Sequence, residues 1–209
     1  MPTLLAFGDS NTHGTAPFRD ERISQRFDAQ TRWPTLALRT LGPNWTLVEE
    51  GLPGRTTALP DPVMGTHMDG REGLKIALAS HGPIDWLTIM LGTNDVKARF
   101  GATPATIVAG FAALVDIAMQ ADMQDRHGGF KILLICPPVA LEAGLLGDEF
   151  IGCEAKSRAL APLLASYATA RGLNFLNAGD HITASPSDGI HFEPDSHATL
   201  AGAVAAAIS

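Results

Sequence analysis

Short apolar runs alternate along the chain with longer segments in which apolar residues recur at helical spacing. Continuous apolar runs are typical of strands buried on both faces of a parallel sheet, and strands are predicted at 3–7, 45–49, 86–91, 131–136 and 173–176. Helices are predicted at 33–41, 70–80, 103–124, 154–170 and 195–208. The alternation predicts an α/β fold, a three-layer α/β/α sandwich with a five-stranded parallel sheet of the flavodoxin-like kind.

Two connections stand out from the predicted elements. The polar stretch 15–31 is long for a connection, and long loops of this kind are often lids, partner surfaces or disordered segments. A variable loop is predicted from 137 to about 153. With 209 residues the chain has the length of one domain, which is predicted to span 1–209.

The charge balance argues against polyanionic partners. The chain carries 15 Lys and Arg against 22 Asp and Glu, a net charge of −7, and has no basic cluster. Neither nucleic acid nor an anionic membrane is therefore expected as a partner. The first strand begins at Thr3, which leaves no room for a signal segment, and no run is long enough to span a bilayer. A cytoplasmic location is expected.

The cysteines and histidines do not form a metal-binding or disulfide pattern. Cys136 continues an apolar strand and Cys153 lies far from it, so both are predicted to be buried thiols. The seven histidines are scattered, and none forms a His-Glu-x-x-His motif. No metal site is predicted.

A candidate nucleophile directly follows the first strand. The run 3–7 stops at Gly8-Asp9-Ser10, and the carboxyl ends of strands are where chemistry gathers in open parallel sheets. Serine becomes a good nucleophile only with a base, a carboxylate that orients the base, and donors for the oxyanion that forms. We therefore ask whether the chain supplies these partners for Ser10.

The oxyanion donors are predicted at the ends of three strands. Gly51 follows the second strand and Asn94 the third, so both are expected at the same sheet edge as Ser10. The N–H groups of Ser10 and Gly51 and the amide of Asn94 would give three donors.

The base is predicted near the end of the chain. Asp188-Gly189-Ile190-His191 spaces a carboxylate and an imidazole three residues apart around a flexible glycine. Such a turn lets Asp188 orient His191 while the far ring nitrogen faces Ser10. His197 lies inside the last predicted helix and is interpreted as a packing residue.

These blocks resemble the SGNH (GDSL-type) hydrolase superfamily, in order and over the whole chain. Segments 32–34, 50–57 and 91–95 are similar to its arylesterase/perhydrolase-like branch. The resemblance implies a serine esterase without metal or cofactor, with catalytic Ser10, Asp188 and His191 and an acyl-enzyme intermediate. It also implies a small ester substrate, such as a short-chain or aryl acetate, and a homo-oligomer. The substrate-binding residues are expected to be Asp9, His13, Thr93, Pro138, Val139 and Ile190.

The chain departs from the branch around the expected acyl pocket. Asn11 and His13 stand where relatives tend to show Leu and Trp, and Pro53 replaces a residue that is commonly Asn. Glu49 stands where many superfamily members carry Asn. These changes leave the predicted triad intact but put the substrate range in question.

Two other interpretations remain open at this level. The same site could act as an acyltransferase or perhydrolase, because the choice between water and another nucleophile depends on the polarity of the pocket. A non-catalytic phosphate- or nucleotide-binding module of flavodoxin-like fold is a further alternative, since 8–15 is rich in hydroxyls. The chain lacks Gly-x-x-x-x-Gly-Lys-Ser/Thr and Gly-x-Gly-x-x-Gly motifs at a strand–helix junction, which weighs against that alternative.

Overall fold

The computed structural model describes residues 1–20 and 23–209. Glu21 and Arg22, which belong to the polar stretch predicted at 15–31, lie outside the described residues.

Five parallel strands form the sheet, as predicted, in the order β2-β1-β3-β4-β5. They are β1 (Thr3–Gly8), β2 (Thr46–Gly51), β3 (Trp86–Met90), β4 (Lys131–Cys136) and β5 (Asn174–Asn177). Gly8 is in register with Gly51 on one side and Met90 on the other. The carboxyl ends of the three strands that precede the predicted site are therefore level with one another.

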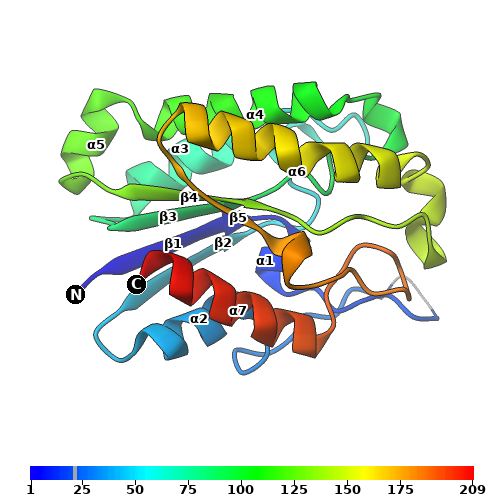
Figure 1. Cartoon of the computed structure of the whole chain (residues 1–209), viewed down its shortest axis with the longest axis horizontal. Coiled ribbons are helices and arrows are strands. Elements are labelled where there is room, and N and C mark those ends of the chain that lie inside the picture. Colours follow the sequence, from blue (N-terminus) through cyan, green and yellow to red (C-terminus); the bar gives the residue numbers. More distant parts are fainter. Residues whose placement is uncertain (21–22) are drawn as a thin grey trace.

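Helices cover both faces of the sheet (Figure 1). The α-helices are α1 (Ser10–His13), α2 (Trp33–Leu41), α3 (Gly70–Ser80), α4 (Pro104–Ala118), α5 (Ala121–His127), α6 (Cys153–Ala170) and α7 (Pro194–Ile208). Short 3₁₀ helices are η1 (Thr66–Met68), η2 (Ala98–Phe100), η3 (Gly144–Glu149) and η4 (Ala178–Asp180). In Figure 1, α3, α4 and α6 lie on one side of the sheet and α2 and α7 on the other, which gives the three layers.

The alternation of side chains along the strands builds two cores. Leu5 and Phe7 of β1 face the core shared with α3, α4 and α6. Leu4 and Ala6 face the core shared with α2 and α7. Successive strand residues point to opposite faces, so a sheet covered on both sides requires an apolar residue at every position. This explains why β1 and β4 are apolar and buried after their first residue.

One predicted helix is wrong in extent. The segment predicted as a single helix at 103–124 forms two helices, α4 and α5, bent by 59° at the break. Gln120 has extended backbone dihedrals, and the Gln124 side chain caps the end of α4 by donating to Ala118 O at 2.8 Å. Neither Gly nor Pro marks this break, so the sequence carries no local stop signal there.

Among the described residues, no individual helix has both the length and the apolar composition to cross a membrane. The bent pair α4 and α5 would meet these two criteria only when taken together.

Candidate active site

The serine predicted to be the nucleophile lies in the tight turn between β1 and α1. A Cβ on Gly8 would lie 2.1 Å from Thr12 Oγ1, so the turn requires glycine at this position. The Asp9 carboxylate caps α1 by accepting the Asn11 N–H at 2.9 Å. Ser10 is thereby held in the first turn of α1, at the carboxyl edge of the sheet.

The predicted acid–base pair lies in the turn that precedes α7. Gly189 has a left-handed backbone, and a Cβ there would lie 2.2 Å from Leu141 O. The Asp188 carboxylate accepts the backbone N–H groups of Ile190 and His191, both at 3.0 Å. The same carboxylate therefore shapes the turn that carries the imidazole.

The structure brings Ser10 and His191 together although they are 181 positions apart. His191 Nε2 lies 3.1 Å from Ser10 Oγ, and His191 Nδ1 lies 2.6 Å from Asp188 Oδ2. When Nδ1 carries the proton and donates it to Asp188, Nε2 is free to accept the Ser10 proton. This arrangement can activate a serine for attack on a carbonyl.

Asp188 is fully buried and remains suited to carry a negative charge. Burial alone would raise its pKa, but the hydrogen bonds from His191 and Ile190 outweigh burial and hold the pKa below the usual value. The Phe18 N–H adds a further hydrogen bond to Asp188 Oδ2 at 2.8 Å. An ionised Asp188 stabilises the imidazolium that forms when His191 takes up a proton.

Phe18 is a site residue that sequence reasoning missed. Its ring meets the His191 ring edge-on, with 5.2 Å between centroids, on the side from which the predicted polar stretch approaches. An isolated aromatic residue in a polar loop shows no periodicity, so its sequence carries no signal for this role.

Asn94 lies at the same sheet edge, as predicted. Its Nδ2 atom donates to Arg55 O at 3.1 Å and lies 3.4 Å from Asp9 Oδ2. Burial raises the pKa of Asp9 to about 6, against the opposing effects of the Asn11 N–H and nearby cations. The Asp9 carboxyl thus lies behind Ser10, where it helps to orient α1 and the Asn94 amide.

Gly51 does not occupy the position expected of an oxyanion donor. It ends β2, where a Cβ would lie 2.2 Å from the backbone N of His13, and it does not line the cavity at Ser10. Gly54 does line that cavity, together with Ser10 and Asn94. Within residues 1–20 and 23–209, the N–H groups of Ser10 and Gly54 donate to no protein acceptor. Of these two glycines, Gly54 is the one that lines the cavity, and the sequence analysis did not name it.

A cavity of about 250 Å³ opens on the Ser10 hydroxyl. Six of the residues that form its wall are apolar, namely Phe18, Pro53, Met64, Leu146, Phe150 and Ile190. Lys97 and Glu149 also line it, and neither was predicted. A larger hollow of about 530 Å³ beside Arg19 and Ile23 contains neither Ser10 nor His191. The smaller cavity is therefore the one placed to receive a substrate.

The residues predicted to bind substrate divide between this cavity and other places. Ile190 lines the cavity. Asp9 and Thr93 are buried next to Ser10 and Asn94 but do not line it, and half-buried His13 does not line it either. Pro138 and Val139 line a separate hollow beside Ile182 and do not line the cavity at Ser10.

The buried polar groups outside the cavity include both thiols and one imidazole. Cys136 and Cys153 are buried and free, as predicted. His197 is fully buried and its Nδ1 accepts the Trp33 N–H at 3.3 Å. Among the described residues, no three His, Cys, Asp or Glu side chains come together in a way that could hold a metal ion.

Comparisons with known proteins agree with this geometry. The sequence model of the GDSL-like lipase/acylhydrolase family matches residues 6–202. An aryl esterase from M. smegmatis is 34% identical with a TM-score of 0.92, and the match covers 99% of this chain and 97% of that chain. A carbohydrate acetylesterase from Sinorhizobium meliloti shows 34% identity, a TM-score of 0.92 and coverage of 99% and 97%. No curated protein sequence matches this chain at a significant level.

The fold and the comparisons define a carboxylic ester hydrolase. The chain belongs to the GDSL-like lipase/acylhydrolase family, within the SGNH hydrolases that its motifs resemble.

Proposed function

We propose that this esterase hydrolyses short-chain and aryl acetates through an acyl-enzyme on Ser10. The observation that carries the proposal is the continuous hydrogen-bonded series Asp188–His191–Ser10, which ends at a small cavity with mostly apolar walls. In this proposal Ser10 is the nucleophile, His191 the base and then the acid, and Asp188 the group that orients His191.

The proposed reaction has two stages. His191 Nε2 takes the Ser10 proton as Oγ attacks the ester carbonyl, and the alcohol leaves with that proton when the C–O bond breaks. Water then enters, gives a proton to His191 and attacks the acyl carbon. The product leaves as a carboxylic acid when His191 returns the proton to Ser10, and the acid then ionises in water.

The charge on the carbonyl oxygen calls for donors in place before the reaction. We propose the N–H groups of Ser10 and Gly54 and the Asn94 amide, with Gly54 in place of Gly51. The N–H groups of Ser10 and Gly54 support this choice, because both residues line the cavity and neither N–H donates to a protein acceptor among the described residues. For an N–H of Asn94 to reach the oxyanion, its weak 3.4 Å contact with Asp9 would be given up.

The proposal is tested by the hydrolysis of p-nitrophenyl acetate. Ser10→Ala and His191→Ala are each expected to lower kcat by at least about a thousandfold. Ser166→Ala and His181→Ala change exposed residues away from the cavity and serve as matched controls. Retention of most of the activity in the Ser10 variant would overturn the proposal.

Acyl transfer is a second candidate function that one observation favours. The six apolar residues of the cavity wall limit the room for water next to the acyl group. An added alcohol is then expected to compete with water for the acyl-enzyme. The ratio of new ester to free acid, measured with increasing alcohol, should rise well above the ratio of the two nucleophile concentrations; a ratio no higher than this would leave hydrolysis alone.

A further inference from the structure

Lys97 places a buried ammonium group in the cavity at Ser10. The residue follows Asn94 in the turn after β3, where its N–H donates to Asn94 O at 3.2 Å. Its side chain is 8% exposed, crosses the Phe150 ring with Nζ 5.5 Å from the centroid, and lines the cavity. The catalytic mechanism proposed above does not use this charge.

The ammonium group lacks close partners among the described residues. Its nearest carboxylate oxygen there is Glu149 Oε2 at 4.0 Å, which is longer than a hydrogen bond. Glu149 is bound more closely by Arg99, at 2.9 Å, and Arg99 also binds Asp61 at 2.6 Å. In the part of the chain that is described, no acceptor lies within hydrogen-bond distance of Lys97 Nζ, so its three donors are available to a ligand.

The protein groups around Lys97 disfavour its charge. Burial is the main cause that lowers the pKa of Lys97, and the Arg99 guanidinium adds to it. Glu149, Asp61 and Asp9 act in the opposite direction but do not outweigh burial. A negative group brought next to Nζ would supply the missing stabilisation, and hydrogen bonds between charged groups are the strong ones.

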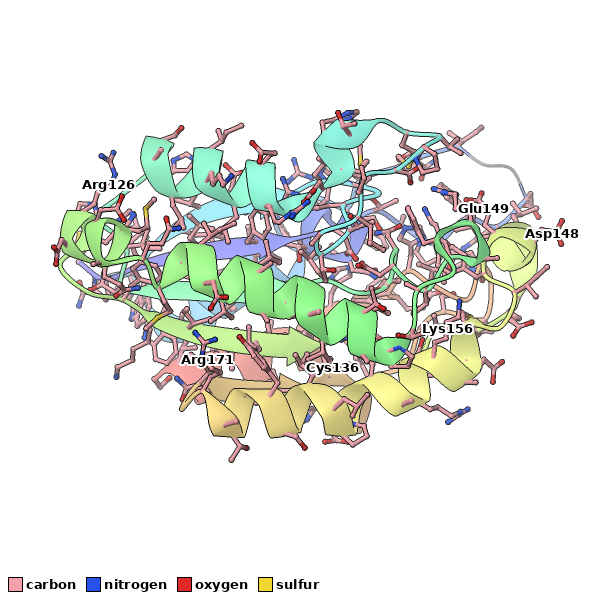
Figure 2. All side chains as sticks on the ribbon, turned by 90° about the horizontal axis from the view of Figure 1, so that it is seen from above. Arg126, Cys136, Asp148, Glu149, Lys156 and Arg171 are labelled. Atoms are coloured by element: carbon pink, nitrogen blue, oxygen red, sulfur yellow. The ribbon has the colours of Figure 1, made fainter. Side chains whose placement is uncertain are left out.

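Glu149 also lines the cavity, and its negative charge would oppose an anion. That charge is engaged by Arg99, whereas the charge of Lys97 is not engaged at hydrogen-bond distance. Figure 2 shows Glu149 toward one end of the molecule and Arg126 at the opposite end. Among the described residues, Lys97 and Arg99 are the cations within 4.0 Å of a Glu149 carboxylate oxygen, and of these two only Lys97 lines the cavity.

We infer that Lys97 binds a carboxylate carried by the substrate, so that the site takes esters with a carboxylate group a few bonds from the scissile ester. The carboxylate could be on the acyl side, as in the monoester of a short dicarboxylic acid, or on the alcohol side. This inference rests on the proposed function, because the same cavity must receive the ester that Ser10 attacks.

The test compares matched charged and uncharged esters. For the acyl side, monoethyl glutarate is compared with ethyl pentanoate; for the alcohol side, para-acetoxybenzoate is compared with para-acetoxybenzamide. In one of these pairs, the wild-type protein is expected to show a kcat/KM at least about tenfold higher for the charged ester. In Lys97→Met that ratio is expected to fall roughly ten- to a hundredfold, and Lys97→Arg should restore part of it.

Lys156→Met is the matched control, because Lys156 lies on the neighbouring α6, donates to Val96 O at 3.4 Å and does not line the cavity. It should leave both ratios as in the wild type. A wild-type ratio near one or below in both pairs would overturn the inference, whether or not the Lys97 variants fold. If the protein hydrolyses charged and uncharged esters equally well, the inference about Lys97 is wrong but the proposed esterase function stands. If it hydrolyses no ester, the proposed function is wrong as well.

Discussion

The Cα of Gly51 lies against the backbone of α1, and this contact explains the glycine. A Cβ would approach His13 N to 2.2 Å and His13 Cα to 2.6 Å, and neither backbone atom can move without shifting the turn that carries Ser10. Gly54 differs, because a Cβ there would meet the flexible end of Met64 and its backbone is left-handed at φ +91°. One glycine permits a close approach of two backbones, and the other turns the chain past the cavity.

Gly51→Ala is therefore expected to disturb the position of α1. The free energy of unfolding should fall by about 1–3 kcal/mol, as for other insertions into packed sites, and kcat should fall with it. Urea unfolding and ester hydrolysis measure the two effects. In Gly202→Ala, the new Cβ would meet nothing within 4 Å in α7, so this control should be more stable by about 0.5–1 kcal/mol. Wild-type stability and activity in Gly51→Ala would contradict the explanation.

At the scale of elements, two hydrogen bonds, from Asn11 and from Phe18, hold the segments that carry the proposed triad together. Asn11 of α1 donates from Nδ2 to Ile190 O at 3.2 Å, so the helix that carries Ser10 is tied to the turn that carries His191. Phe18 N–H binds Asp188 on the other side of the same turn. These bonds join segments that approach from opposite ends of the chain.

Removing the Asn11 bond is expected to slow the chemistry more than it weakens binding. Asn11→Ala should lower kcat about tenfold with a smaller change in KM, because a small misplacement of His191 relative to Ser10 weakens proton transfer. Steady-state kinetics with p-nitrophenyl acetate measure the two constants. Asn174→Ala removes a comparable bond, from Asn174 Nδ2 to Ile132 O, far from the site and is the control. A kcat within twofold of the control would show that Asn11 does not position the triad.

An element can be predicted from the sequence when neighbouring residues determine it, and not when a tertiary contact does. The strands were predicted to within one or two residues, because short runs rich in apolar residues mark them, most clearly in β1 and β4, which are buried after their first residue. The break between α4 and α5 was not predicted, because it depends on the Gln124 side chain reaching Ala118 O. Local propensity favours a continuous helix there, and a tertiary contact decides otherwise.

For the whole molecule, parallel topology is what made part of the site predictable. Ser10 and Asn94 follow strands whose ends lie at one edge, and Asp188 and His191 are near neighbours in sequence. Phe18 and Lys97 were missed because their side chains reach the cavity from loops whose course depends on packing. The same reason applies to Gly51, which does not line the cavity: the chain needs three further residues to reach it, at Gly54.

The helical layer formed by α2 and α7 contains a buried imidazole that couples stability to pH. His197 Nδ1 accepts the Trp33 N–H at the start of α2, and its ring makes edge-type contacts with the rings of Phe27 and Phe192. Burial is the main cause that lowers the pKa of His197, from 6.5 to about 4. The neutral ring fits this layer, and the protonated ring does not.

The stability supplied by the neutral ring should be lost as the solution becomes acidic. Above pH 6.5 the ring is neutral in both states; between 6.5 and about 4 the unfolded chain binds a proton that the folded chain does not, so stability falls with falling pH. The loss should reach about 2 kcal/mol near pH 5. Burial raises the pKa values of Asp9 and Asp95 to about 6, and these two groups act in the opposite direction over an overlapping range.

A variant comparison isolates the histidine from those two carboxyls. Asn at position 197 can still accept the Trp33 N–H but does not titrate, so the stability advantage of the wild type over His197→Asn should shrink by about 2 kcal/mol between about pH 7 and about pH 5. Urea unfolding at a series of pH values measures this difference, and the contributions of Asp9 and Asp95 cancel because both proteins carry them. Ser166→Ala, an exposed and non-titrating change, should differ from the wild type by a constant amount. A constant difference for His197→Asn as well would show that the buried ring does not resist protonation.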